Sequence, residues 1–364
     1  MCVSNRRPFR SRRLVVATLV CCVLLAACAE LSYYAQSAGG QLRLLAGARP
    51  IDSALTDLTL APSLREKLAL ARSIREFAVS QLQLPNNGSY RQVVLLERPF
   101  LIWNVFATAT DSIEPQTHCF PIAGCVPYRG YFNEAAARDY AAELQSAGFD
   151  TYVAGVPAYS TLGWFNDPLP SSLLRYPEHE IARVIFHELA HQVVYLPGDA
   201  TFNESFASSV EDMGVRRWFN SRPNAAGLAD YELARQRRHD FLRLVQAARY
   251  GLVDAYSANT LAQRRAAAAA VYVTLHRAYA EQKERWGGYA GYDGFMSRVN
   301  NAALISIATY TDWVPAFDAL LLRNGDDPAQ FYAAARALAD LPAESRRQEM
   351  LRLCAAVNCV ALAQ

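Results

Sequence analysis

Residues 187–191, His-Glu-Leu-Ala-His, have the types and the spacing of a metal-dependent hydrolytic site. His187 and His191 lie four positions apart in a segment with helical periodicity, so both imidazoles can face one Zn²⁺ ion. Glu188 lies beside them and points away from the ligand direction, where it can take a proton from a water molecule that the metal activates. Apolar residues flank the motif at 184–186 and 193–195. They predict a buried helix, in which unpaired polar side chains would be costly.

A third metal ligand is expected from the helix that follows. Pro197 and Gly198 end the first helix, and Glu204 lies near the start of the next, where it can face the two histidines. The alternative is that Glu204 forms a capping box with Thr201. Glu211, seven residues further on, either holds a ligand histidine through a hydrogen bond or is a solvated charge, and Asp212 is the other candidate for that contact.

The elements that must position these residues predict an α+β fold, a small β-sheet followed by a predominantly helical part. We expect a sheet-rich part over about 85–170 and a helical part over about 175–364. Strands are predicted at 93–96, 101–108 and 150–162. Helices are predicted at 64–83, 133–147, 178–195, 202–219, 227–250, 260–285, 291–307, 312–323, 327–339 and 342–354.

The N-terminus has the pattern of a bacterial lipoprotein signal over residues 1–27. Arginines precede an apolar run, Leu14 to Leu25, which is too short to span a bilayer comfortably. Ala26 and Ala27 then precede Cys28, the expected site of lipidation. An ordinary secretory signal or an uncleaved anchor is the alternative. The sequence thus predicts a mature chain 28–364 anchored to the membrane and facing the periplasm, with the outer membrane favoured because Ala29 is not aspartate.

Four cysteines remain in that mature chain. Local pairing of Cys119 with Cys125 and of Cys354 with Cys359 is the simplest connectivity in an oxidising compartment, and a zinc site built from all four is the competing interpretation. The net charge is +2, so nothing in the charge balance indicates a nucleic-acid partner.

The zinc motif followed by Asn203-Glu204-Ser-Phe-Ala resembles the gluzincin metallopeptidases, especially zinc aminopeptidases. It is most similar to bacterial lipoproteins described as predicted aminopeptidases. The resemblance also covers residues 118–131, 158–164 and 314–317. It implies a zincin-like catalytic part, one Zn²⁺ held by His187, His191 and Glu204, and a peptide substrate. The Gly-x-Met-Glu-Asn segment of larger aminopeptidases is absent, so the exopeptidase assignment rests on the resemblance alone.

Weaker candidates complete the predicted site. The hydroxyl of Tyr310, or that of Tyr159, is a candidate to stabilise the tetrahedral oxyanion. Residues 154–164 are a candidate edge strand for an extended substrate, with an ordinary strand as the alternative. We therefore expect a zinc peptidase with Glu188 as general base. An endopeptidase on the same site, and a non-catalytic envelope protein with a structural zinc, remain the alternatives.

Overall fold

The computed structural model describes residues 31, 33–120, 124–222, 224–308 and 313–357. The chain divides into two units, the first ending at Ala46 and the second running from Gly47. The described part of the first unit is helical over 33–46. Within the described residues, no helix is both long and apolar enough to cross a membrane. Cys28, Tyr310 and Cys359 lie outside the described residues.

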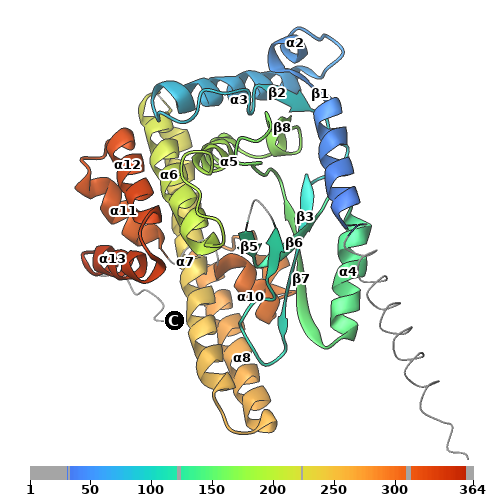
Figure 1. Ribbon diagram of the computed structural model, residues 1–364, viewed down its shortest axis with the longest axis vertical. Coiled ribbons are helices and arrows are strands. Elements are labelled where there is room, and N and C mark those ends of the chain that lie inside the picture. Colours follow the sequence, from blue (N-terminus) through green and yellow to red (C-terminus); the bar gives the residue numbers. More distant parts are fainter. Residues whose placement is uncertain (1–30, 32, 121–123, 223, 309–312, 358–364) are drawn as a thin grey trace, which may run out of the picture. The chain divides into compact units, whose positions relative to one another are not determined.

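The second unit contains three small sheets (Figure 1). In the first sheet the strand order is β1 (Ala48–Pro50), β2 (Gln92–Val94), β8 (Leu169–Pro170). In the second sheet it is β6 (Tyr128–Tyr131), β3 (Ile102–Ala109), β7 (Phe149–Val156). The third sheet is a pair of strands, β4 (His118–Phe120) and β5 (Gly124–Val126). Helices α4 (Glu134–Ser146) and α10 (Asn301–Ala308) both pack against β3 and β7. Six consecutive residues of β3 are buried, because neither of its faces is left to solvent.

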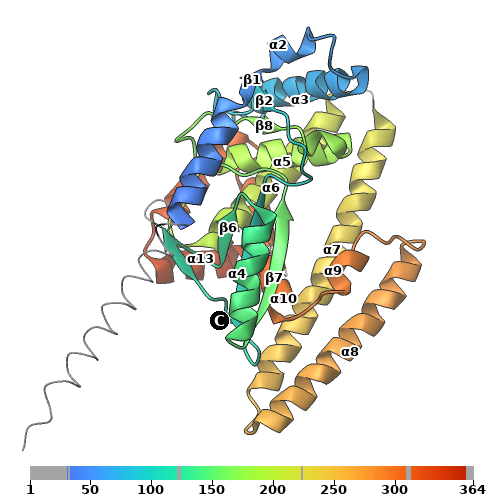
Figure 2. The same ribbon diagram turned by 90° about the vertical axis from the view of Figure 1, so that its right-hand side faces the viewer.

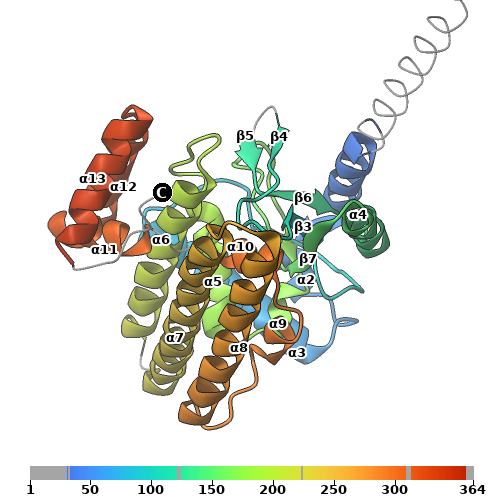
Figure 3. The same cartoon turned by 90° about the horizontal axis from the view of Figure 1, so that it is seen from below.

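Helices make up most of the unit, and three of them contact the helix that carries most of the candidate site. Besides α4 and α10, the helices are α2 (Ile51–Leu55), α3 (Pro62–Ser80), α5 (Glu178–Ala190), α6 (Ala200–Asn220), α7 (Ala225–Tyr256), α8 (Leu261–Arg285), α9 (Asp293–Met296), α11 (Val314–Arg323), α12 (Pro328–Ala339) and α13 (Ala343–Ala355). Figure 2 shows α7 and α8 as a long antiparallel pair, and Figure 3 shows α5 and α6 beside α7. The main core includes residues of α3, α5, α6, α11, α12 and α13.

The α+β class and most helix positions are as predicted, with differences at element ends. The helix predicted over 178–195 ends at Ala190, and the one predicted over 291–307 is divided into α9 and α10. The strand predicted over 150–162 ends at Val156. Strands β1, β4, β5, β6 and β8 were not predicted, because two to four residues are too few to display an alternating pattern.

Close packing of α5 against α6 depends on a residue without a side chain. A Cβ atom on Gly214 would lie 2.6 Å from Cδ2 of Phe186 and 2.8 Å from Cδ1 of Leu82. Phe186, which directly precedes His187, is fully buried. Gly214 therefore sets how closely α6 approaches the helix that carries the motif.

We expect Gly214→Ala to destabilise the protein, because the new methyl group overpacks this contact at a cost of about 1–3 kcal/mol. Urea unfolding of the purified protein measures the change. Gly294→Ala is the matched control, because a Cβ atom at that helical glycine has no neighbour within 4 Å. Equal stability of Gly214→Ala and wild type would contradict this role.

Candidate metal centre

Helix α5 carries the two histidines at its C-terminal end. It starts directly after Pro177, with Glu178 and Glu180 in its first turn, where acidic side chains favour the helix dipole. His187 lies in the last turn, whereas His191 is the C-cap residue, one position beyond the helix. Both residues are buried, at 9% and 7% relative exposure.

Asn203, the residue before Glu204, holds the loop between α5 and α6 through two hydrogen bonds. The Asn203 side chain accepts a hydrogen bond from the Leu196 backbone nitrogen at 2.7 Å and donates one to the Leu196 carbonyl at 2.8 Å. Both bonds fix the chain between the two helices. Asn203 belongs to the sequence motif, but its hydrogen bonds to the Leu196 backbone were not predicted.

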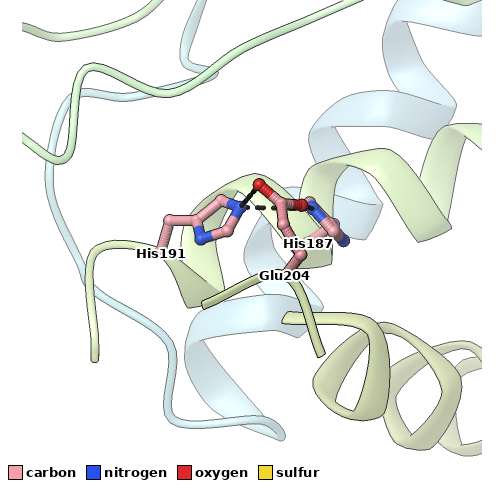
Figure 4. Close-up of side chains that lie close together, drawn as sticks. All are labelled: His187, His191 and Glu204. Carbon is pink, nitrogen blue, oxygen red and sulfur yellow. Dashed lines mark hydrogen bonds and ion pairs between the residues drawn. The ribbon is translucent and has the colours of Figure 1, made fainter. Parts of the chain in front are cut away.

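The N-cap of α6 is Asp199, whose side chain accepts a hydrogen bond from the Phe202 backbone nitrogen at 3.0 Å. The expected alternative, a capping box between Thr201 and Glu204, is therefore wrong. Glu204 lies inside the helix, and its carboxylate points towards the two histidines (Figure 4).

Three donor atoms meet at one point between the helices. Nε2 of His187 lies 3.2 Å from Nε2 of His191 and 3.1 Å from one Glu204 oxygen, while Nε2 of His191 lies 3.7 Å from the other oxygen. Two ligands of a tetrahedral zinc ion, each roughly 2.0–2.1 Å from it, are roughly 3.3 Å apart. These three residues form a group that could hold a metal ion.

Glu211 fixes the other side of the His187 ring. One Glu211 oxygen lies 3.0 Å from Nδ1 of His187 and 3.1 Å from Nη1 of Arg183, and the second accepts from Nη1 of Arg238 at 2.9 Å. Glu211 is only 2% exposed. In the neutral ring that binds a metal, with the Nδ1 proton donated to Glu211, Nε2 would present its lone pair to the metal position.

Asp212, the other candidate for this contact, binds elsewhere. Its carboxylate accepts hydrogen bonds from the Tyr231 hydroxyl and from Nε of Arg235, the latter at 2.7 Å. Sequence reasoning also missed Arg183 and Arg238. Arg183 lies four residues before His187, so its spacing offered a signal, but nothing local pointed to Arg238 on α7.

The electrostatics follow from burial and from these contacts. Burial raises the pKa of Glu211, but the guanidinium groups of Arg183 and Arg238 outweigh it and bring the pKa to about 2. Burial lowers the pKa of His187, whereas its hydrogen bonds to Glu204 and Glu211 raise it to about 10. Burial lowers the pKa of His191 to about 4.

Glu188 is half-buried beside the donor group. Burial raises its pKa to about 7; His187 opposes this shift, and the negative charges of Glu204 and Asp167 add to it. Tyr159 is close enough for the charges of Asp167 and Glu188 to contribute to its raised pKa, although burial is the main cause. The candidate edge strand is only partly formed, because residues 157–164 continue β7 as irregular chain.

A disulfide joins Cys119 to Cys125, as predicted, and closes the β4–β5 hairpin. This pairing excludes the zinc site built from all four cysteines. Cys354 is also disulfide-bonded, while Cys359 lies outside the described residues. The hairpin contacts the α5–α6 loop, since a Cβ atom on Gly124 would lie 2.4 Å from the Gly198 nitrogen.

A family model described as "putative aminopeptidase" matches residues 32–351. The chain belongs to this family. The aminopeptidase family match includes α5, α6 and the whole donor group, and family membership points to a peptidase. Neither the curated proteins nor the solved structures gave a match.

Glu211→Gln should weaken metal binding roughly 10–100-fold, a range typical for the partners of metal ligands. The amide keeps the shape of the side chain but removes the charge that orients His187 and offsets two arginines. Competition with a chelator measures the metal Kd. Glu232→Gln is the control, because that carboxylate pairs with Arg216 on the protein surface at 3.2 Å. An unchanged Kd in Glu211→Gln would show that Glu211 does not support the ligand.

Proposed function

We propose that the protein is a zinc-dependent peptidase, and specifically an aminopeptidase, whose metal is held by His187, His191 and Glu204. The observation that carries this proposal is that donor atoms of His187 on α5, His191 directly after α5 and Glu204 on α6 lie close together, with a fourth side chain, Glu188, next to them. Membership of the aminopeptidase family supports the peptidase part. The donor chemistry, two imidazole nitrogens and one carboxylate oxygen, favours zinc.

The number of protein ligands distinguishes a catalytic zinc site from a structural one. A structural zinc site usually has four protein ligands, whereas catalytic sites have three and keep one position open. Among the described residues, the donor group has three members. A structural site would also have no need of Glu188.

A zinc ion bound here would polarise the scissile carbonyl and lower the pKa of the attacking water molecule. In the proposed mechanism Glu188 accepts the proton of that water and passes it to the leaving amine. Glu211 holds His187 in the tautomer that binds metal. The hydroxyl of Tyr310 or Tyr159 is proposed to hydrogen-bond the developing oxyanion.

Glu188→Gln tests the chemistry, because it keeps the side-chain shape but removes the base. We expect it to retain one zinc ion, fold normally and hydrolyse amino-acyl reporter substrates roughly 10²–10⁴-fold more slowly than wild type. His187→Ala should lose the zinc as well. Glu344→Gln is the control, because Glu344 is an exposed carboxylate on α13. Zinc-free wild type with no hydrolysis, or Glu188→Gln with full activity, would refute the mechanism.

The same assay separates an exopeptidase from an endopeptidase if each peptide is offered with a free and with a blocked amino terminus. An aminopeptidase must bind the free α-ammonium group, so cleavage should be confined to the free-amine series. Equal cleavage of both series would leave the zinc mechanism in place and identify an endopeptidase.

We also propose that the chain is a lipoprotein, lipidated at Cys28 and anchored to the membrane on the periplasmic side, with the outer membrane favoured. The support is the order of arginines, apolar run, two alanines and cysteine in the leader. The disulfide between Cys119 and Cys125 is compatible with an oxidising compartment.

Cys28→Ser should release the protein from the membrane fraction or stop its processing, because the acceptor of the lipid is gone. Fractionation and the mass of the mature chain measure this. Cys22→Ser within the leader is the control and should leave anchoring intact. A Cys28→Ser protein that is processed and anchored like wild type would rule out lipidation at this residue.

A further inference from the structure

The two metal-facing histidines are held in different ways. Nδ1 of His187 is fixed by Glu211 at 3.0 Å. Nδ1 of His191 is buried and, within the part of the chain that the structure describes, has no hydrogen-bond partner. His191 also lies one residue beyond the end of α5. The His191 backbone nitrogen still donates to the His187 carbonyl at 3.3 Å, as the C-cap of the helix. The residues that follow must therefore help to hold the chain that leaves the helix at His191.

The next residue, Gln192, supplies a tether. Its Oε1 accepts a hydrogen bond from Nδ2 of Asn87 at 2.6 Å, and its Nε2 donates to Oγ of Ser89 at 3.2 Å. These partners lie more than 100 positions earlier in the chain, in the loop between α3 and β2. The side chain of Gln192 thus ties the backbone that carries His191 to a distant loop.

That loop is itself rigidly held. Oδ1 of Asn87 accepts from the Ser89 backbone nitrogen at 3.1 Å, which orients Nδ2 towards Gln192. Arg75 of α3 is only 1% exposed and donates to the carbonyl oxygens of Ser89 and Pro85 at 2.8 and 2.7 Å. Burial of an arginine is costly, and here its hydrogen bonds go to the loop backbone. Arg75 therefore fixes the conformation of the loop whose residues Asn87 and Ser89 form hydrogen bonds with Gln192.

We propose that Gln192, held by Asn87, is a positioning residue for the metal ligand His191. This inference rests on the proposed metal site. In this arrangement the ring of His191 takes its orientation from its backbone. Two kinds of contact hold that backbone: the last helical hydrogen bonds, including the one from the His191 nitrogen to the His187 carbonyl at 3.3 Å, and the Asn87–Gln192 hydrogen bond. Losing the Asn87–Gln192 bond lets Nε2 of His191 move away from the position defined by His187 and Glu204.

The test uses Gln192→Met, which keeps the length of the side chain but cannot form the bond, and Asn87→Ala, which removes the donor. Both should weaken zinc binding tenfold or more, within the roughly 10–100-fold range for residues that orient ligands. Both should also change the visible absorption of the Co²⁺-substituted protein, which reports ligand geometry. Asn86→Ala is the matched control, because this neighbour is exposed and its side chain accepts a hydrogen bond from Arg91, at 2.9 Å, rather than from Gln192.

The double variant, Gln192→Met with Asn87→Ala, completes a double-mutant cycle, which measures how strongly the two side chains are coupled. If the two side chains act as one unit, the double variant should bind zinc no more weakly than either single variant. Wild-type Kd and wild-type Co²⁺ absorption in both single variants, even with lowered thermal stability, would overturn the proposal and leave Gln192 a purely structural residue. The same loss in Asn86→Ala would also overturn it. A wild-type protein that binds no zinc would instead refute the proposed function.

Discussion

The close approach of α5 and α6 is the constraint on which the candidate site depends. One helix presents His187, and the other presents Glu204 and Glu211, so the donor spacing of about three ångströms exists only at this interhelical distance. Gly214 permits the approach by leaving room for the ring of Phe186. The absence of a side chain at this one residue thus affects the placement of Glu211, about one turn away on α6, of Glu204, about three turns away on α6, and of His187 on α5.

Burial of so much charge at this interface needs compensation. Glu211 lies at 2% exposure among His187, Arg183 and Arg238, and it accepts a hydrogen bond or ion pair from each. Removing one partner of such a network leaves an uncompensated buried charge, which costs several kcal/mol. Glu211 is therefore a stabilising centre for three helices and also the orienting partner of a ligand. The two roles can be separated by comparing metal affinity with unfolding free energy.

Sequence reasoning pointed to His187, His191, Glu204 and Glu211 because residues four or seven positions apart lie on the same face of a helix. It also assigned the α+β class and most helices, since long segments show their periodicity clearly. It misplaced the end of α5 and the N-cap of α6, because Asn203, Asp199 and the chain around Leu196 form bonds that periodicity does not record. It did not find Arg238 or Asn87, whose partners lie 27 and 105 positions away and become neighbours only on folding. It also did not find Arg75, which donates to backbone carbonyls of the loop that follows its own helix.

Because of these distant partners, the geometry of the site depends on residues far outside the motif at 187–191. The position of His187 depends on Arg238 of α7 through Glu211, and that of His191 depends, in our proposal, on α3 through the loop before β2. The supporting residues thus extend from Arg75 to Arg238, on both sides of the motif. The family match, over residues 32–351, extends beyond this range at both ends. A short peptide with the five motif residues would have the ligands but none of the contacts that fix them, so metal affinity here should be a property of the folded unit.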